Sequence, residues 1–529
     1  MKFVNTRKSE KVTGAQAIVQ CLAGNGGLFV PESFPKISQE EFAQMGEMSY
    51  AERVAFVLEK FLGDELGKDF LLNACEDAFA KFTSADPVPL VKVDDGFYML
   101  ELFHGPTCSA KDLSMRLMPA LLQRSCEIVG VKEELFVFTA TTGDTGKAAM
   151  EAFRDQKGVK VAVIYPDESV VKMQRLQLSV QDGDNVFSAA YETSFDECQR
   201  MTREAFTKEE FTAALQANNM RLINVSSLNI GRILPQIAYF FSAYLDLQTS
   251  GKVEDNEAVD FVLPVSNFGG AMAGWYAKQM GLPIRKLVCA SNRNHTLSEF
   301  FRSGKFDMKR NLQRTMSPSM DVLAAANIER LIFELSGRDT KATAQRMKDF
   351  ASKKEYNLSC EEKKRLDADF AGGYASEDDT VEAMYEIFDE YGYAMDTHTG
   401  VALSVFFDYA EKKDKKDYTQ TVVLATANPY KFPQDVLYAL SGNDVKDSFK
   451  GVKRLNLLTA MKPPKSLLEL RYRPLRFKKS YPKDGKKLMA AVLDFMGGEI
   501  IPVPDGGAEG EGAVAPEAGT KGKAPTKKK

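Results

Sequence analysis

The chain has 529 residues, of which 44% are apolar and 27% are charged, and its formal net charge at pH 7 is −4. This length is too great for one hydrophobic core, so the chain is expected to form two or three packed units. The near balance of charges gives no basis for attraction to nucleic acid or to membranes over most of the chain.

Seven cysteines are scattered along the chain without a CxxC pair. An odd number of cysteines without clustering predicts that the thiols are reduced. It indicates neither a disulfide framework nor a metal site. The first residues, MKFVNTRKSEKV, lack the apolar core of a secretory signal, and no stretch approaches 18 consecutive apolar residues. We therefore expect a cytoplasmic protein without a membrane or nucleic-acid partner. The sequence leaves open whether it is a monomer or a homodimer.

Residues 1–100 are predicted to form a mostly helical N-terminal domain. In SYAERVAFVLEKFLG, residues 49–63, the apolar residues recur on one helix face. Residues 101–440 are predicted to form an α/β region of two subdomains, because short apolar runs alternate with helical segments and are followed by glycines and hydroxyl residues. This alternation is typical of open, mostly parallel sheets with sites at the carboxyl ends of the strands. The predicted strands are 134–140, 159–166, 184–191, 258–265, 284–291 and 420–427.

Three further segments differ in composition from the rest of the chain. Residues 337–395 are predicted to be a charged helical insertion. Residues 441–504 are predicted to be a basic C-terminal extension, since 453–487 contains twelve Lys and Arg against two Asp and Glu. Residues 505–529 contain almost nothing that could be buried, so a disordered tail is expected.

Lys111 lies between a His-Gly-Pro-Thr turn and a run with helical apolar spacing, in ELFHGPTCSAKDLSMRL. From spacing alone it is a solvated surface lysine. Its apolar neighbours favour burial, however, and burial lowers the pKa of a lysine and makes it a nucleophile.

Two glycine-rich turns each follow a predicted strand and precede a predicted helix. TATTGDTGKAA spans 139–149 and PVSNFGGAMAG spans 264–274. Backbone N–H groups in such turns converge on an anion, although turn glycines with a helix cap are an equally good interpretation of the first turn. Two anion-binding turns and a buried lysine together fit a phosphorylated aldehyde cofactor joined to the lysine as a Schiff base.

Thr426 ends the last predicted strand, in LATANPYKF, where it could cap a helix or donate a hydrogen bond to a ring nitrogen. Neither His295 nor His398 has metal-ligand spacing to other residues. The absence of GxSxG from the sequence argues against a Ser–His–Asp hydrolase.

Taken together, these stretches resemble the threonine synthases, pyridoxal-phosphate enzymes of the tryptophan-synthase-β fold (fold type II), in their longer bacterial and fungal branch. The matches run in the family's order from about residue 3 to about 440. They are NGGLFVPE, HGPTCSAKD, TATTGDTG, FDECQ, NVSSLNIGRILPQIAYF, SNFGG, TMSPSMDV, MDTHTGVAL and TANPYKF.

The resemblance implies that the chain is a lyase that uses pyridoxal 5'-phosphate to convert O-phospho-L-homoserine and water to L-threonine and phosphate. This is the last step of threonine biosynthesis. It implies that Lys111 forms the Schiff base and then transfers protons, and that Thr426 faces the pyridine nitrogen. The cofactor phosphate would be held by Ser266, Asn267, Phe268, Gly269 and Gly270. The substrate would be held by Thr142, Gly143, Asp144, Thr145 and Arg232.

The sequence departs from the family pattern at four of these motifs. Ser266 replaces a glycine of the phosphate loop, and Ala110 stands where the family usually has phenylalanine. Asn428 replaces a histidine and Thr397 a proline. None of these changes removes the lysine, so catalysis is expected to survive, while the fit of the substrate is less constrained.

Two other functions stay open at this point. The chain could be a threonine-synthase-like phospho-lyase that eliminates phosphate and releases 2-oxobutyrate, and Ala110 is a change that could alter the access of water. It could instead be a scaffold without catalytic activity, whose basic residues 453–487 and Lys-rich C-terminal end bind nucleic acid or another acidic partner.

Overall fold

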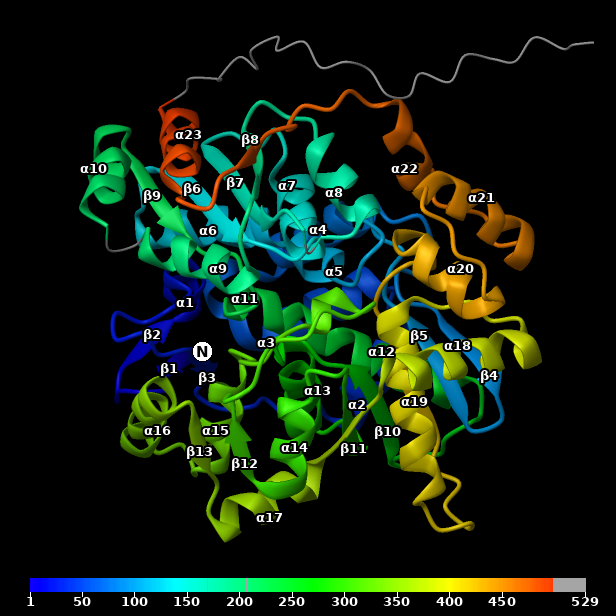
Figure 1. Cartoon of the computed structure of the whole chain (residues 1–529). Helices are drawn as coiled ribbons and strands as arrows, with labels where there is room; N and C mark the ends of the chain where they lie inside the picture. Colours follow the sequence, from blue (N-terminus) through cyan, green and yellow to red (C-terminus); the bar gives the residue numbers. More distant parts are fainter. Residues whose placement is uncertain (169, 206–207, 498–529) are drawn as a thin grey trace, which may run out of the picture.

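The computed structural model describes residues 1–168, 170–205 and 208–497. The predicted disordered tail at 505–529 lies outside these residues. Figure 1 shows two sheets, each surrounded by helices, with the N-terminal helices packed behind them. Within the described residues, no helix is long and apolar enough to cross a membrane.

The N-terminal region combines helices with a small sheet. The antiparallel strands β1 (Lys2–Asn5), β2 (Lys11–Thr13) and β3 (Phe29–Pro31) pair in the order β2-β1-β3. Ser49 caps α3, since its side chain accepts from the N–H of Glu52. The four helices are α1 (Gly14–Gln20), α2 (Gln39–Glu47), α3 (Tyr50–Leu66) and α4 (Lys68–Phe79).

A six-stranded sheet forms the larger lobe, in the order β14-β11-β10-β15-β5-β4. All neighbours are parallel except β4 and β5. Both faces are buried, because Phe261 belongs to one hydrophobic cluster and its neighbour Val262 to another. The strands are β4 (Leu90–Asp94), β5 (Phe97–Glu101), β10 (Val259–Pro264), β11 (Ile284–Ser291), β14 (Phe370–Tyr374) and β15 (Thr421–Ala425).

A five-stranded sheet forms the smaller lobe, in the order β16-β8-β7-β6-β9, and all its neighbours are parallel. Its strands are β6 (Glu134–Ala140), β7 (Val159–Pro166), β8 (Val186–Tyr191), β9 (Met220–Ile223) and β16 (Ser480–Tyr481). The six strands predicted from the sequence are therefore confirmed within one or two residues, and so is the mostly parallel α/β fold class.

The charged region 337–395 contains two strands, β13 (Glu355–Asn357) and β14, that its composition does not indicate. Its helices α16 (Thr340–Lys353), α17 (Cys360–Asp369) and α18 (Glu377–Tyr391) agree with the predicted helical character. Between α17 and α18, however, β14 forms the edge of the six-stranded sheet. Gly372 allows this strand to pack closely, since a Cβ there would lie 2.7 Å from the ring of Phe301.

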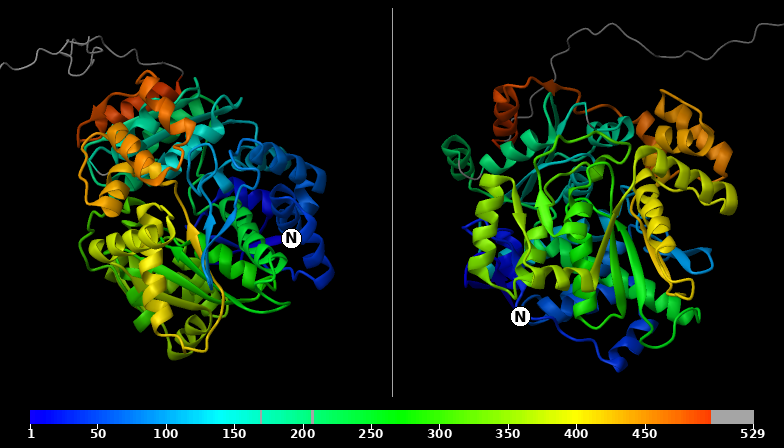
Figure 2. Two further views of the ribbon diagram at one scale, coloured as in Figure 1. Left: turned by 90° about the vertical axis from the view of Figure 1, so that its right-hand side faces the viewer. Right: turned by 60° about the horizontal axis from the view of Figure 1, so that its bottom comes forward.

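The basic C-terminal extension joins the two lobes. After α20 (Pro433–Ser441) and α21 (Ser448–Thr459), it passes through α22 (Lys465–Leu468) to β16 and α23 (Lys486–Met496). Both views in Figure 2 show this orange and red segment running from the larger lobe to the smaller one. The N–H groups of Arg476 and Phe477 both donate to the carbonyl oxygen of Ser179, which fastens the segment to the smaller lobe.

Candidate active site

The loop that carries Lys111 is fastened to the end of β15. Ala110 N–H donates to the carbonyl oxygen of Thr426 over 2.8 Å, and Leu102 N–H donates to that of Ala425 over 2.9 Å. Because β5 and β15 are parallel neighbours, this loop and Thr426 both lie at the carboxyl edge of the larger sheet. Lys111 and Thr426 therefore reach the same cavity from adjacent strands.

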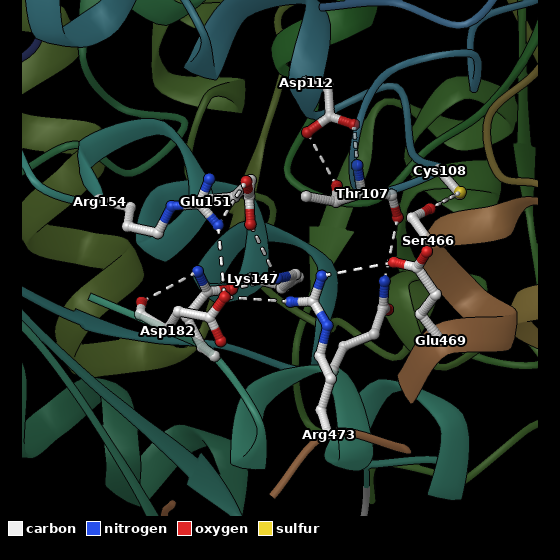
Figure 3. A network of polar contacts seen from close by, with 12 residues as sticks. Thr107, Cys108, Asp112, Lys147, Glu151, Arg154, Asp182, Ser466, Glu469 and Arg473 are labelled. Carbon is white, nitrogen blue, oxygen red and sulfur yellow. Dashed lines mark hydrogen bonds and ion pairs between the residues drawn. The ribbon is translucent and has the colours of Figure 1, made fainter. Parts of the chain in front are cut away.

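The turn before Lys111 is built around Asp112. Asp112 accepts hydrogen bonds from the N–H of Thr107 (2.7 Å) and from its hydroxyl (2.8 Å), as Figure 3 shows. Gly105 is required here, since a Cβ would lie 2.4 Å from the Cβ of Asp112. Burial raises the pKa of Asp112 to about 6, against the effect of the two Thr107 hydrogen bonds. The turn thus holds a buried acid directly after the lysine in the chain.

The amine of Lys111 is free to react with a ligand. The residue is half-buried and lines the cavity, and within the described residues its Nζ has no hydrogen-bond or ion-pair partner. Burial lowers its pKa, Asp144 opposes that effect, and Arg232 adds to it. An amine with a lowered pKa loses its proton readily and can act as a nucleophile.

Residues 266–270 form an open cup of backbone N–H groups. The cup leads from β10 into α13 (Gly269–Gln279), and its turn needs the left-handed conformation of Phe268, with φ of 63°. No side chain of the described part of the chain caps this helix, so its first N–H groups are available to a ligand. The side chain of Asn267 does not face a ligand freely, because its Oδ1 accepts from Ala326 N–H and its Nδ2 donates to Ser227.

The turn at 141–145 is the second cup, at the start of α7 (Asp144–Phe153). The hydroxyl of Thr141 accepts from the N–H groups of Gly143 and Gly146, both at 2.9 Å, and so serves the turn itself. Gly143 has φ of 136°, and a Cβ there would lie 2.5 Å from Gln174. The side chains of Thr142 and Thr145 line the cavity.

Arg232 is a buried cation without an acidic partner among the described residues. Its Nε donates to the hydroxyl of Ser114 (2.8 Å) and its Nη1 to the carbonyl oxygen of Val225 (2.9 Å). Burial lowers its pKa to about 10, although Asp112 opposes that effect. The residue is 2% exposed and lines the cavity. A buried guanidinium without a counter-ion favours the binding of an anion there.

One cavity brings together eleven of the twelve residues predicted for the site. The twelfth, Gly143, lies in the same turn as Thr142 and Asp144. The Lys111 amine suits the aldehyde of the predicted cofactor, the cup at 266–270 suits its phosphate, and the Thr426 hydroxyl suits its ring nitrogen. The cup at 141–145 and the Arg232 guanidinium suit the anionic groups of a substrate. The residues present therefore fit pyridoxal phosphate.

Sequence reasoning missed three residues that hold this arrangement: Lys431, Gln174 and Ser114. Lys431 and Gln174 bind Asp144, and Ser114 binds Arg232. Lys431 belongs to the TANPYKF motif, which was the one available signal. Both histidines singled out in the sequence have acidic partners in the structure. His398 binds Asp396 and accepts a hydrogen bond from the N–H of Ser319, which lines the cavity, whereas His295 contacts Glu299.

Comparison with known proteins agrees with this geometry. The family description "Threonine synthase N terminus" matches residues 2–79, and "Pyridoxal-phosphate dependent enzyme" matches residues 85–427. Threonine synthase of Pseudomonas aeruginosa is 33% identical over 439 residues, which cover 82% of this chain and 90% of the relative. The crystal structure of PLP-bound threonine synthase from Brucella melitensis superposes with a TM-score of 0.82 at 32% identity, covering 94% of this chain and 99% of the other.

Another relative differs in length. The human protein "Threonine synthase-like 1" is 32% identical over 469 residues, which cover 84% of this chain. These residues span 62% of that relative, so this chain corresponds to a part of it.

Proposed function

Because the chain belongs to the threonine synthase family of pyridoxal-phosphate-dependent enzymes, we propose that it converts O-phospho-L-homoserine and water to L-threonine and phosphate. The observation that carries this proposal is that one cavity holds two N–H cups, the amine of Lys111 and the guanidinium of Arg232, and that neither cation has an acidic partner among the described residues. This set suits an amino acid that carries both a carboxylate and a phosphate.

The residues divide into those that hold the cofactor and those that hold the substrate. Lys111 binds the cofactor aldehyde, the cup at 266–270 binds the cofactor phosphate, and the Thr426 hydroxyl faces the ring nitrogen. Within the described residues this hydroxyl has no protein partner, which supports its assignment to a ligand. Pyridoxal phosphate, when bound, supplies an electron sink for the substrate carbons next to the amino group.

The protein's own contribution is proton transfer and anion binding. Lys111, once released by the substrate amine, takes and returns protons at Cα, Cβ and Cγ, because burial lowers its pKa and so makes its neutral, basic form easier to reach. Thr142, Thr145 and Arg232 bind the carboxylate and phosphate of the substrate. Holding the phosphate in place orients the Cγ–O bond for cleavage, after which water adds at Cβ.

The test is an assay of purified protein with O-phospho-L-homoserine, in which phosphate, threonine and 2-oxobutyrate are measured separately. We expect threonine and phosphate in equal amounts. Release of 2-oxobutyrate without threonine would contradict the proposal and favour the phospho-lyase reaction.

The lysine assignment has its own test. Lys111→Ala should abolish turnover and the borohydride-sensitive visible absorption band of the protein. Lys348→Ala, which alters an exposed lysine of α16, should preserve both. Retained turnover in Lys111→Ala would refute the assignment.

A further inference from the structure

Lys431 is fully buried, and its ammonium group contacts Asp144, a residue that lines the active-site cavity. Its exposed fraction is 0%, and its Nζ lies 2.7 Å from Oδ1 of Asp144. The same ammonium donates to the carbonyl oxygen of Thr107 over 2.9 Å. A buried lysine is costly unless it is paired and hydrogen-bonded, and both conditions are met here.

These two contacts join three separate parts of the chain. Lys431 follows β15 of the larger sheet, Asp144 begins the helix after β6 of the smaller sheet, and Thr107 belongs to the loop of the catalytic lysine. Thr107 in turn holds Asp112, next to Lys111 (Figure 3). One ammonium group therefore sets the distance between the lysine loop and the cup at 141–145.

Asp144 would otherwise be an obstacle in that cup. A carboxylate beside an anion-binding turn repels the anion, and Asp144 lines the same cavity as Thr142 and Thr145. Burial alone would raise its pKa, but the charge and hydrogen bond of Lys431, together with His398 and Gln174, hold the pKa at about 2. Gln174 donates to the same oxygen over 2.7 Å. Asp144 and Lys431 together thus present a neutral pair.

We propose that Lys431 is a positioning residue that neutralises Asp144 and so allows the cup at 141–145 to bind an anion beside Lys111. The proposal rests on the proposed function only in taking that anion to be the substrate's. Anion binding is measurable without turnover. A failure of the proposed reaction can therefore be distinguished from a failure of the role proposed for Lys431.

The experiment is a titration of the cofactor-loaded protein with sodium sulfate by calorimetry. Sulfate mimics phosphate but keeps its charge over the working pH range, and the bound cofactor keeps the cup at 266–270 occupied. Lys431→Met should weaken sulfate binding by about tenfold or more, because it leaves a buried carboxylate unpaired. Lys431→Met/Asp144→Asn should bind within about threefold of the unaltered protein, since the charge is then removed.

The matched control is Lys413→Met. Lys413 is also mostly buried and ion-paired, 2.8 Å from Asp260, but its partner Asp260, unlike Asp144, does not line the cavity. The Lys413→Met variant should be less stable than the unaltered protein but should bind sulfate equally tightly. Asp144→Asn alone, which keeps Lys431, should bind sulfate at least as tightly as the unaltered protein.

A pH series adds a signature that a merely structural role would not produce. The defect of Lys431→Met should shrink as the pH falls, because the unpaired Asp144 then takes up a proton. Unchanged sulfate binding in Lys431→Met, or equal weakening in the double variant, would overturn the proposal. So would weaker binding in Asp144→Asn.

Discussion

The backbone N–H of Ala110 donates to the carbonyl oxygen of Thr426 over 2.8 Å, so the residue before Lys111 is fastened to the end of the neighbouring strand. The bond uses only the backbone of Thr426. Its hydroxyl is left to the cavity, so the side chain can be changed without loosening the lysine loop.

Thr426→Val should therefore keep the fold and lose catalytic efficiency. The change removes one hydrogen bond, which contributes about 1 kcal/mol. Because this bond would stabilise the transition state, kcat should fall about fivefold to tenfold. The visible absorption band of the cofactor-loaded protein should shift with it. Thr421→Val, at the other end of β15, should alter neither kcat nor the spectrum. Equal kcat and spectra in both variants would show that the Thr426 hydroxyl does not reach the cofactor.

Arg232→Gln should weaken the use of an anionic substrate. The guanidinium is buried and without an acidic partner among the described residues, so its loss removes a charge-assisted contact of about 1.5–3 kcal/mol. This corresponds to a loss in kcat/KM of about 10- to 150-fold, mostly through KM. Arg232→Lys should be intermediate, since lysine keeps the charge but not the fork of donors. Unchanged KM in Arg232→Gln would exclude contact with the substrate.

Gly105→Ala should destabilise the protein and reduce its activity. The new Cβ would lie 2.4 Å from the Cβ of Asp112, so the turn or the acid must move. We expect a loss of about 1–3 kcal/mol in the free energy of unfolding. Gly46→Ala is the matched control, since nothing lies within 4 Å of a Cβ there, in helix α2. It should stabilise by about 0.5–1 kcal/mol. Denaturant unfolding that gives both variants the same stability would contradict this account of the turn.

Asp112→Asn should change how stability depends on pH. Burial raises the pKa of Asp112 from 3.8 to about 6, so the folded protein holds this proton more tightly than the unfolded chain does. Its contribution to stability is therefore present below pH 4 and is lost as the pH rises to about 6, by about 3 kcal/mol. Asn does not titrate. The stability advantage of the unaltered protein over Asp112→Asn should thus shrink between pH 4 and pH 7, as measured by urea unfolding. A constant difference would show that Asp112 is ionised throughout this range.

Much of the site could be predicted because its residues are close in sequence. Ser266 to Gly270 and Thr142 to Thr145 are continuous turns, and their glycines and hydroxyls follow strands whose apolar runs are plain. Lys431 could not be assigned in this way. Its partners Asp144 and Thr107 are hundreds of residues away in the chain, and a lysine in a polar motif is exposed in most proteins.

The strand β14 shows the same limit in the fold. It lies between two charged helices and contains two adjacent glycines, which by themselves disfavour a strand. It forms because the edge of β11 offers backbone partners and because Gly372 permits close packing on Phe301. Neither condition is visible in residues 337–395 alone.

The sequence by itself determined the alternation of strands and helices, the two glycine-rich turns, and the lysine that the family motif singles out. These are properties of short segments, set by apolar periodicity and backbone freedom. Only the tertiary structure decided which charges are paired. Asp144 is neutralised by Lys431, while Arg232 has no acidic partner among the described residues and the amine of Lys111 has none at all there. Burial and ion pairing depend on what packs around a group, and packing joins residues that the chain keeps far apart.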